Sequence, residues 1–273
     1  MTLSERAAVN MALPVPHALL RLALPIFASQ ALRLAYQWVD ALWVRGLGVE
    51  STAAITTSVF VLWWVYALND VFCVGASAFV SQLIGAGERG RAGATTAMLV
   101  RASAVLGLMV AVAAPFVARP IFQLLDPTGQ VVDEGTAYLR VVLLAAPLTM
   151  VAIAFETAMR AAGDTRTPLL LDLGAVLLNA LLAPVLIYGW GPFPRMGIAG
   201  AALATAIAHG MLVVNFARLA RRGHPALPFS WRATEAPIRL AALARVGLPN
   251  ALIGILFSVV YIVFARAASP YGA

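Results

Sequence analysis

Long apolar runs separated by short polar stretches dominate the chain. The runs cover residues 19–44, 54–84, 97–118, 137–159, 169–190, 197–219 and 246–265. Each is long enough to cross a bilayer as a helix, which takes roughly 20 apolar residues. Residues 104–117 are apolar at every position, whereas the strands of a membrane barrel alternate apolar and polar residues. The pattern therefore predicts an all-α polytopic membrane protein with about seven transmembrane helices.

Composition supports a membrane protein and removes several kinds of chemistry. Hydrophobic residues make up 62% of the chain and charged residues 11%, and all 19 basic residues are arginines. Without lysine, neither a Schiff base with retinal or pyridoxal nor a phosphate-binding P-loop can form. One cysteine and three scattered histidines provide no disulfide, no zinc site and no HExxH motif. We therefore expect no enzyme activity, no cofactor and no resident metal.

The arginines also predict how the chain is oriented. Residues 1–16 are polar, and the run that follows is too long for a cleaved signal peptide, so we expect an uncleaved anchor. A cytoplasmic N-terminus places twelve arginines inside (Arg6, Arg21, Arg89, Arg91, Arg160, Arg166, Arg218, Arg221, Arg222, Arg232, Arg239, Arg245) and five outside (Arg45, Arg119, Arg140, Arg195, Arg266). Because basic loops stay in the cytoplasm, this split predicts an inner-membrane protein with its N-terminus inside. It also accounts for the net charge of +7 without a nucleic-acid partner.

A short repeat suggests that the chain is built from two lobes. The sequence RLALP at 21–25 returns as RVGLP at 245–249, after a proline-rich polar stretch. Six predicted helices separate the copies, as in transporters made of parallel repeats. The predicted parts are a six-helix lobe over 1–222, a cytoplasmic linker over 223–240 and the first helix of an incomplete second lobe over 241–273. We therefore expect an N-terminal fragment whose main partner is the missing C-terminal half of the same transporter.

Polar residues form a stripe along the first predicted helix. Gln30, Arg33, Gln37 and Asp40 are spaced by 3, 4 and 3 residues, so they share one face. A charged side chain in a helix centre costs roughly 2.5–3.5 kcal/mol in lipid, so this face turns toward other helices or a water-filled cavity. We predict that Asp40 binds a coupling ion and that Gln30, Arg33, Tyr36 and Gln37 line a cavity. The alternative for Arg33 and Asp40 is a pair that only holds the bundle together.

Three further positions are candidates on the same reasoning. Asn179 lies deep in its predicted helix, where its amide either bonds to another helix or offers an oxygen to a cation. Thr205 ends a row of small residues that favours close helix packing, and its hydroxyl can also bind a cation. Pro25 interrupts the hydrogen bonds of the first helix and either forms a hinge or sets the entry angle. Asn69, Asp70 and Tyr138 receive no role.

Several segments together resemble the multidrug and toxic compound extrusion (MATE) family of cation-coupled exporters. They are LALPIFASQ at 22–30 with YQWVDALWVRGLG at 36–48, VSQLIGAG at 80–87, RAAGDTRTP at 160–168 and GIAGAALAT at 197–205. The resemblance covers the family's N-terminal lobe and the first helix of its C-terminal lobe. It implies export of amphipathic, often cationic, drug-like compounds in exchange for protons or sodium ions, and a first helix that bends as the ion binds.

One position departs from the family pattern. Many members carry an aspartate four residues after the asparagine that corresponds to Asn179, whereas this chain has Ala183. A single carboxylate is enough to carry a proton, so we favour proton coupling over sodium.

Two other functions fit parts of the pattern. A flippase for lipid-linked oligosaccharides or peptidoglycan precursors shares the superfamily architecture, but it calls for several arginines in a wide cavity. Here only Arg33 lies deep in a predicted helix, and Arg101 is shallower. A seven-helix receptor or sensor fits the helix count but not the parallel repeat.

Overall fold

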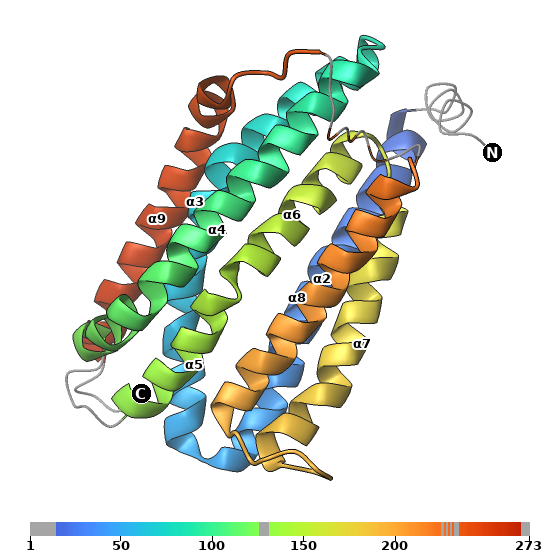
Figure 1. The fold of residues 1–273 in the computed structure, drawn as a ribbon. Coiled ribbons are helices and arrows are strands. Elements are labelled where there is room, and N and C mark those ends of the chain that lie inside the picture. Colours follow the sequence, from blue (N-terminus) through green and yellow to red (C-terminus); the bar gives the residue numbers. More distant parts are fainter. Residues whose placement is uncertain are drawn as a thin grey trace.

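A single bundle of long helices makes up the described part of the chain. The computed structural model describes residues 15–125, 131–224, 227, 229, 231 and 235–268, and at several helical positions it describes the backbone alone. The helices are α2 (Val15–Val44), the short 3-10 helix η1 (Arg45–Leu47), α3 (Val49–Gly85), α4 (Arg89–Leu125), α5 (Val132–Leu144), α6 (Ala146–Ala161), α7 (Arg166–Tyr188), α8 (Ile198–Arg221) and α9 (Leu240–Ala268). They run side by side along one axis (Figure 1), and the described residues contain no strand.

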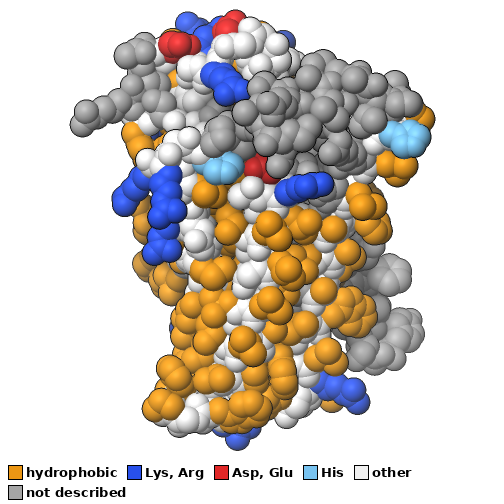
Figure 2. Space-filling model, turned by 90° about the vertical axis from the view of Figure 1, so that its right-hand side faces the viewer, with side chains coloured by type: hydrophobic (Ala, Val, Ile, Leu, Met, Phe, Trp, Pro, Cys, Tyr) orange, Lys and Arg blue, Asp and Glu red, His pale blue; other side chains and the backbone are white. Residues whose placement is uncertain are grey.

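The helices confirm the predicted fold class. Among the described residues, α3, α4, α7, α8 and α9 are each long and apolar enough to cross a membrane, and the bent pair α5–α6 makes a sixth span if counted as one. The first predicted run lies within α2. One face of the bundle carries a broad hydrophobic belt with arginines at both of its edges (Figure 2). The chain is therefore a multi-pass helical membrane protein.

The fourth predicted span is broken, which the sequence analysis did not anticipate. The expected helix over 137–159 is divided at Ala145 into α5 and α6, which are bent by 50°. Pro147 stands in the first turn of α6, where it lacks an N–H and its ring clashes with the preceding turn. On α4, a Cβ at Gly107 would come within 2.5 Å of the Pro147 Cα. The glycine thus allows α4 to pack directly against the bend.

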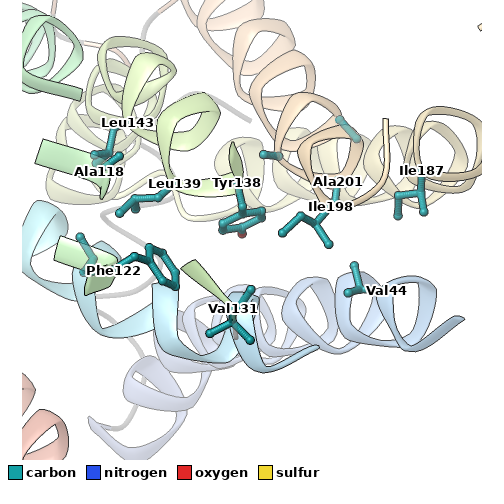
Figure 3. Close-up of a cluster of buried hydrophobic side chains, with 14 of the residues drawn as sticks. Val44, Ala118, Phe122, Val131, Tyr138, Leu139, Leu143, Ile187, Ile198 and Ala201 are labelled. Atoms are coloured by element: carbon teal, nitrogen blue, oxygen red, sulfur yellow. The ribbon is translucent and has the colours of Figure 1, made fainter. Parts of the chain in front are cut away.

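Buried apolar side chains fill the half of the bundle that contains the α2–α3, α4–α5 and α7–α8 connections. Figure 3 shows Phe122 of α4 beside Leu139 and Tyr138 of α5, with Ile198 of α8 nearby. Phe122 is fully buried, and its ring occupies the space that a side chain at Gly135 would need. A second buried group, around Phe155, lies toward the other half of the bundle.

The orientation predicted from the distribution of arginines can be tested in this fold. The connections 86–88 and 162–165, the end of α8 and the start of α9 lie at one end of the bundle, here called the arginine-rich end (Figure 1). Reporter fusions at Gly163 and Gly223 are expected to report the cytoplasm, and a fusion at Pro194 the periplasm, because arginine-rich loops are retained inside. Paired alkaline phosphatase and fluorescent protein fusions would measure this. A periplasmic signal from Gly223 would contradict the predicted orientation.

Candidate functional site

Three predicted residues from three different helices meet inside the bundle. Thr205 Oγ1 of α8 lies 3.5 Å from Asp40 Oδ2 of α2, and Asn179 Nδ2 of α7 donates to Thr205 Oγ1 at 3.2 Å. The Asn179 side chain is also a hydrogen-bonding neighbour of the Asp40 carboxyl group. Asp40 and Asn179 are buried, with 9% and 1% of their surface exposed. A carboxylate, an amide and a hydroxyl thus share one site, here called the Asp40 cluster.

The Thr205 hydroxyl has two possible acceptors but only one proton. It lies 3.1 Å from the carbonyl oxygen of Ala201, one turn earlier in α8, and 3.5 Å from the Asp40 carboxylate. Rotation of the hydroxyl therefore decides whether its proton or its lone pairs face the carboxylate. This arrangement can adapt to an ionised carboxylate, to a protonated one or to a bound cation.

Contacts near the ends of α2 and α7 hold the cluster in place. The Tyr188 hydroxyl, on the last residue of α7, donates to the Trp43 carbonyl oxygen near the end of α2 at 2.5 Å. Gly46 leaves the space that the Tyr188 hydroxyl occupies. Because Asp40 lies one turn before Trp43, this bond fixes its position relative to α7.

Close packing of α7 and α8 depends on Gly200. A Cβ at this position would come within 2.6 Å of the Leu186 backbone. We expect Gly200→Ala to push α8 away from α7, to lengthen the Asn179–Thr205 contact and to destabilise the fold by about 1–3 kcal/mol. Thermal unfolding in detergent, followed by tryptophan fluorescence, would measure the loss.

A matched glycine on the same helix provides the control. A Cβ at Gly210 would meet only the end of the Leu148 side chain, at 3.7 Å. Alanine there is expected to be neutral or mildly stabilising, because glycine weakens a helix interior. Equal thermal losses for Gly200→Ala and Gly210→Ala would show that close packing at Gly200 is unimportant.

The remaining predicted cavity and hinge residues are placed only in part. Gln30 is exposed and lies ten positions before Asp40, about 15 Å along the helix. Helix α2 continues through position 25 without a break. The side chains of Pro25, Arg33, Tyr36 and Gln37 lie outside the described residues. The hinge, the cavity lining and the Arg33–Asp40 pair stay predictions.

Position 183 lies beside the cluster and carries no charge. Ala183 is fully buried, one turn after Asn179 on α7. Among the described residues, no group of three or more His, Cys, Asp or Glu side chains is arranged to hold a metal ion. The carboxyl, amide and hydroxyl oxygens of the cluster suit a proton or a hard monovalent cation.

Sequence reasoning left two neighbours of the cluster without a role. Tyr138 of α5 is buried and interacts electrostatically with Asp40. His209, one turn after Thr205, has its Nδ1 atom 2.9 Å from the Thr205 carbonyl oxygen. Tyr138 is polar in an apolar run, which was a usable signal, but sequence spacing alone does not show which helices pack together.

Other buried polar residues hold helices together away from the cluster. Ser103 Oγ donates to Asn69 Oδ1 at 2.9 Å, which joins α4 to α3. Arg160 lies 2.9 Å from Glu156 and 3.5 Å from Asp172, so it bridges α6 and α7. The bond from Ser103 gives Asn69 a packing role, which the sequence had left open.

Comparisons with known proteins agree with this architecture. The family model MatE matches residues 25–185. The probable multidrug resistance protein YoeA of Bacillus subtilis is 28% identical over 255 residues, which covers 91% of this chain and 55% of YoeA. The probable multidrug resistance protein NorM of Thermotoga maritima is 28% identical over 262 residues, covering 93% of this chain and 55% of NorM. The chain thus spans about half the length of the curated relatives it matches.

A solved structure extends the comparison to three dimensions. An outward-facing MATE transporter of the MOP superfamily is 25% identical and superimposes with a TM-score of 0.80 over 88% of this chain and 53% of its own. Sequence and structure therefore confirm the resemblance expected from the short segments. Because the family model matches more than half of the residues of this chain, the chain belongs to the MatE family.

Proposed function

We propose that this chain forms the ion-coupling half of a secondary multidrug exporter in the bacterial inner membrane. In the whole transporter, uptake of a proton or sodium ion drives export of amphipathic, often cationic, compounds. The observation that carries the proposal is the Asp40 cluster, whose three side chains all come from the first six-helix lobe. Relatives named as multidrug resistance proteins support the drug-like substrate class. The second lobe supplies the rest of the substrate cavity.

The coupling ion acts by preferring one conformation of the transporter. A ligand shifts an equilibrium only by the difference between its affinities for the two states. In the described arrangement, Asp40 is buried beside Asn179 and Thr205, so its carboxyl group has little contact with water. Movement of α2 away from α7 and α8 would expose the carboxylate and change its affinity for the ion. A hinge at Pro25 would allow such a movement.

Proton coupling is the preferred form of the mechanism. The cluster carries one formal negative charge on Asp40, and Ala183 adds none. A proton neutralises that charge completely and needs no further ligand. A sodium ion needs several oxygen ligands, and here it would have one carboxylate, supplemented by neutral amide, hydroxyl and carbonyl oxygens.

Infrared difference spectroscopy tests the ion-coupling role on the 273-residue chain itself. We expect the chain in lipid nanodiscs to show a protonated carboxyl band that appears reversibly as the pH falls. Asp40→Asn should remove that band, because the amide cannot take up the proton. Asp172→Asn is the matched control, since Asp172 is also buried but contacts Arg160. A spectrum unchanged by Asp40→Asn would contradict the proposed site.

A further inference from the structure

The described residues of the polar stretch between α8 and α9 contact the bundle at several points. The described residues Leu227, Phe229, Trp231 and 235–239 form what is here called the strap. Leu227 is buried at the arginine-rich end. The Phe229 ring lies 5.5 Å from that of Phe155 in α6 and 4.7 Å from that of Trp231. Leu227 is thus buried and Phe229 packs against α6, so this part of the linker is docked on the bundle.

Arg101 of α4 makes two contacts with the same strap residue. Its guanidinium donates to the Trp231 carbonyl oxygen at 3.2 Å and lies 5.8 Å from the centroid of the indole ring. A hydrogen bond from a charged donor and a cation–π contact reinforce each other. This pair accounts for a charged residue within a predicted span.

Arg101 also indicates the depth of the strap in the membrane. Arg101 and Arg119 lie 18 positions apart on α4 with no charged residue between them, a length of about 27 Å, close to the thickness of a hydrocarbon core. Arg101 and Trp231 would then lie at the membrane surface, where tryptophan and arginine are favoured. The first turns of α4, residues 89–100, extend beyond it.

The strap makes two more contacts with that extension of α4. The backbone N–H of Ile238 donates to Thr95 Oγ1 at 3.1 Å, and Thr95 is fully buried. The Glu235 carboxylate occupies the space beside Gly90 that a side chain would need. Helix α9 begins at Leu240, two positions after Ile238.

These contacts leave only a short free length of chain between the two predicted lobes. The 19 positions from Arg221 to Leu240 could extend for about 60 Å if free. With Ile238 fixed on α4, only two positions remain, or about 7 Å. The backbones of α3 and α9 also touch at this end, because a Cβ at Gly75 would clash with the Leu243 backbone and one at Gly247 with the Val71 backbone.

We propose that the strap is a latch that holds the arginine-rich end of the transporter closed. While Trp231 and Ile238 stay bound to α4, the start of α9 cannot move away from the first lobe. Opening of the cytoplasmic side would require the strap to leave Arg101 and Thr95. This role rests on the proposed alternating-access function, but the docking itself can be tested without any transport.

Spin-label distances on the 273-residue chain test the latch. Labels at Arg166→Cys, at the start of α7, and Ala241→Cys, at the start of α9, would be introduced in a Cys73→Ser background; both label positions are exposed and lie off the strap. We expect one narrow distance distribution in nanodiscs. The double variant Arg101→Ala and Thr95→Val should add a longer-distance population, with the ratio of open to closed molecules rising about tenfold.

Two further variants make the outcome decisive. Arg119→Ala removes an exposed arginine of the same helix that pairs with Asp133, and it should leave the distribution narrow. Trp231→Ala changes a residue that is 55% exposed, so it should fold even if the double variant does not, and it should also add longer distances. Distributions that stay narrow in the strap variants would overturn the latch and assign closure to the α3–α9 contact. Because no ion or substrate is involved, that result would leave the exporter proposal standing.

Discussion

Asp40→Asn is expected to abolish export driven by a pH gradient in a transporter that joins this chain to a second lobe. Asparagine keeps the size of the side chain and can still contact Asn179 and Thr205, the neighbours of Asp40 in the cluster. It cannot take up or release a proton. The two conformations would then no longer differ in proton affinity. The pH gradient could therefore no longer shift the equilibrium between them. The expected loss of coupled efflux is complete.

Efflux of a cationic dye from proteoliposomes would measure this loss. A pH gradient is imposed without sodium, and the amount of folded protein in the membrane is compared by fluorescence-detected size exclusion. Asp172→Asn serves as the control, since it removes a buried carboxylate that contacts Arg160 outside the cluster. Normal efflux by Asp40→Asn would make this carboxylate structural and would move the search for the coupling group to another part of the transporter.

The membrane helices could be predicted because their signal is local. An apolar run of bilayer length has few alternatives to a helix, since backbone polar groups must be satisfied inside the segment. Each predicted run coincides with a described helix or helix pair, apart from two residues at the end of the run 169–190 and one at the start of the run 197–219. The bend at Ala145 follows from a local signal as well, the proline at 147, but apolar composition alone did not reveal it.

The site could be predicted only as separate residues. A carboxylate at 40 and an amide at 179 are costly in lipid, so the sequence identified each as a group that needs a partner. That these groups meet through Thr205 depends on how α2, α7 and α8 pack, which a single sequence does not show. The structure supplies that link.

The contacts of the strap could not be predicted from composition. Prolines and arginines between α8 and α9 favour an extended linker. The attachment depends on partners far away in sequence, such as Arg101, which lies 130 positions before Trp231. No local pattern in the linker encodes that contact.

Ala183→Asp is expected to convert a proton-coupled transporter into one with a marked sodium dependence. Ala183 lies fully buried one turn from Asn179, so an aspartate there would add a second negative charge beside Asp40. Two carboxylates close together repel each other and favour a shared cation. The sodium ion would gain a charged ligand in place of a methyl group. A buried charge also costs stability, so the variant should need sodium to remain folded.

Parallel measurements separate the two effects. Dye efflux is recorded with a sodium gradient alone and with a pH gradient alone, and thermal unfolding is recorded with and without sodium. Ala183→Asn is the matched control, because it adds similar bulk and an oxygen ligand without the charge. We expect Ala183→Asp to gain both sodium-driven efflux and sodium-dependent stability, and Ala183→Asn to gain neither. If the unmodified transporter already requires a sodium gradient and ignores the pH gradient, one carboxylate with neutral oxygen ligands is sufficient for sodium and the assignment of proton coupling is wrong.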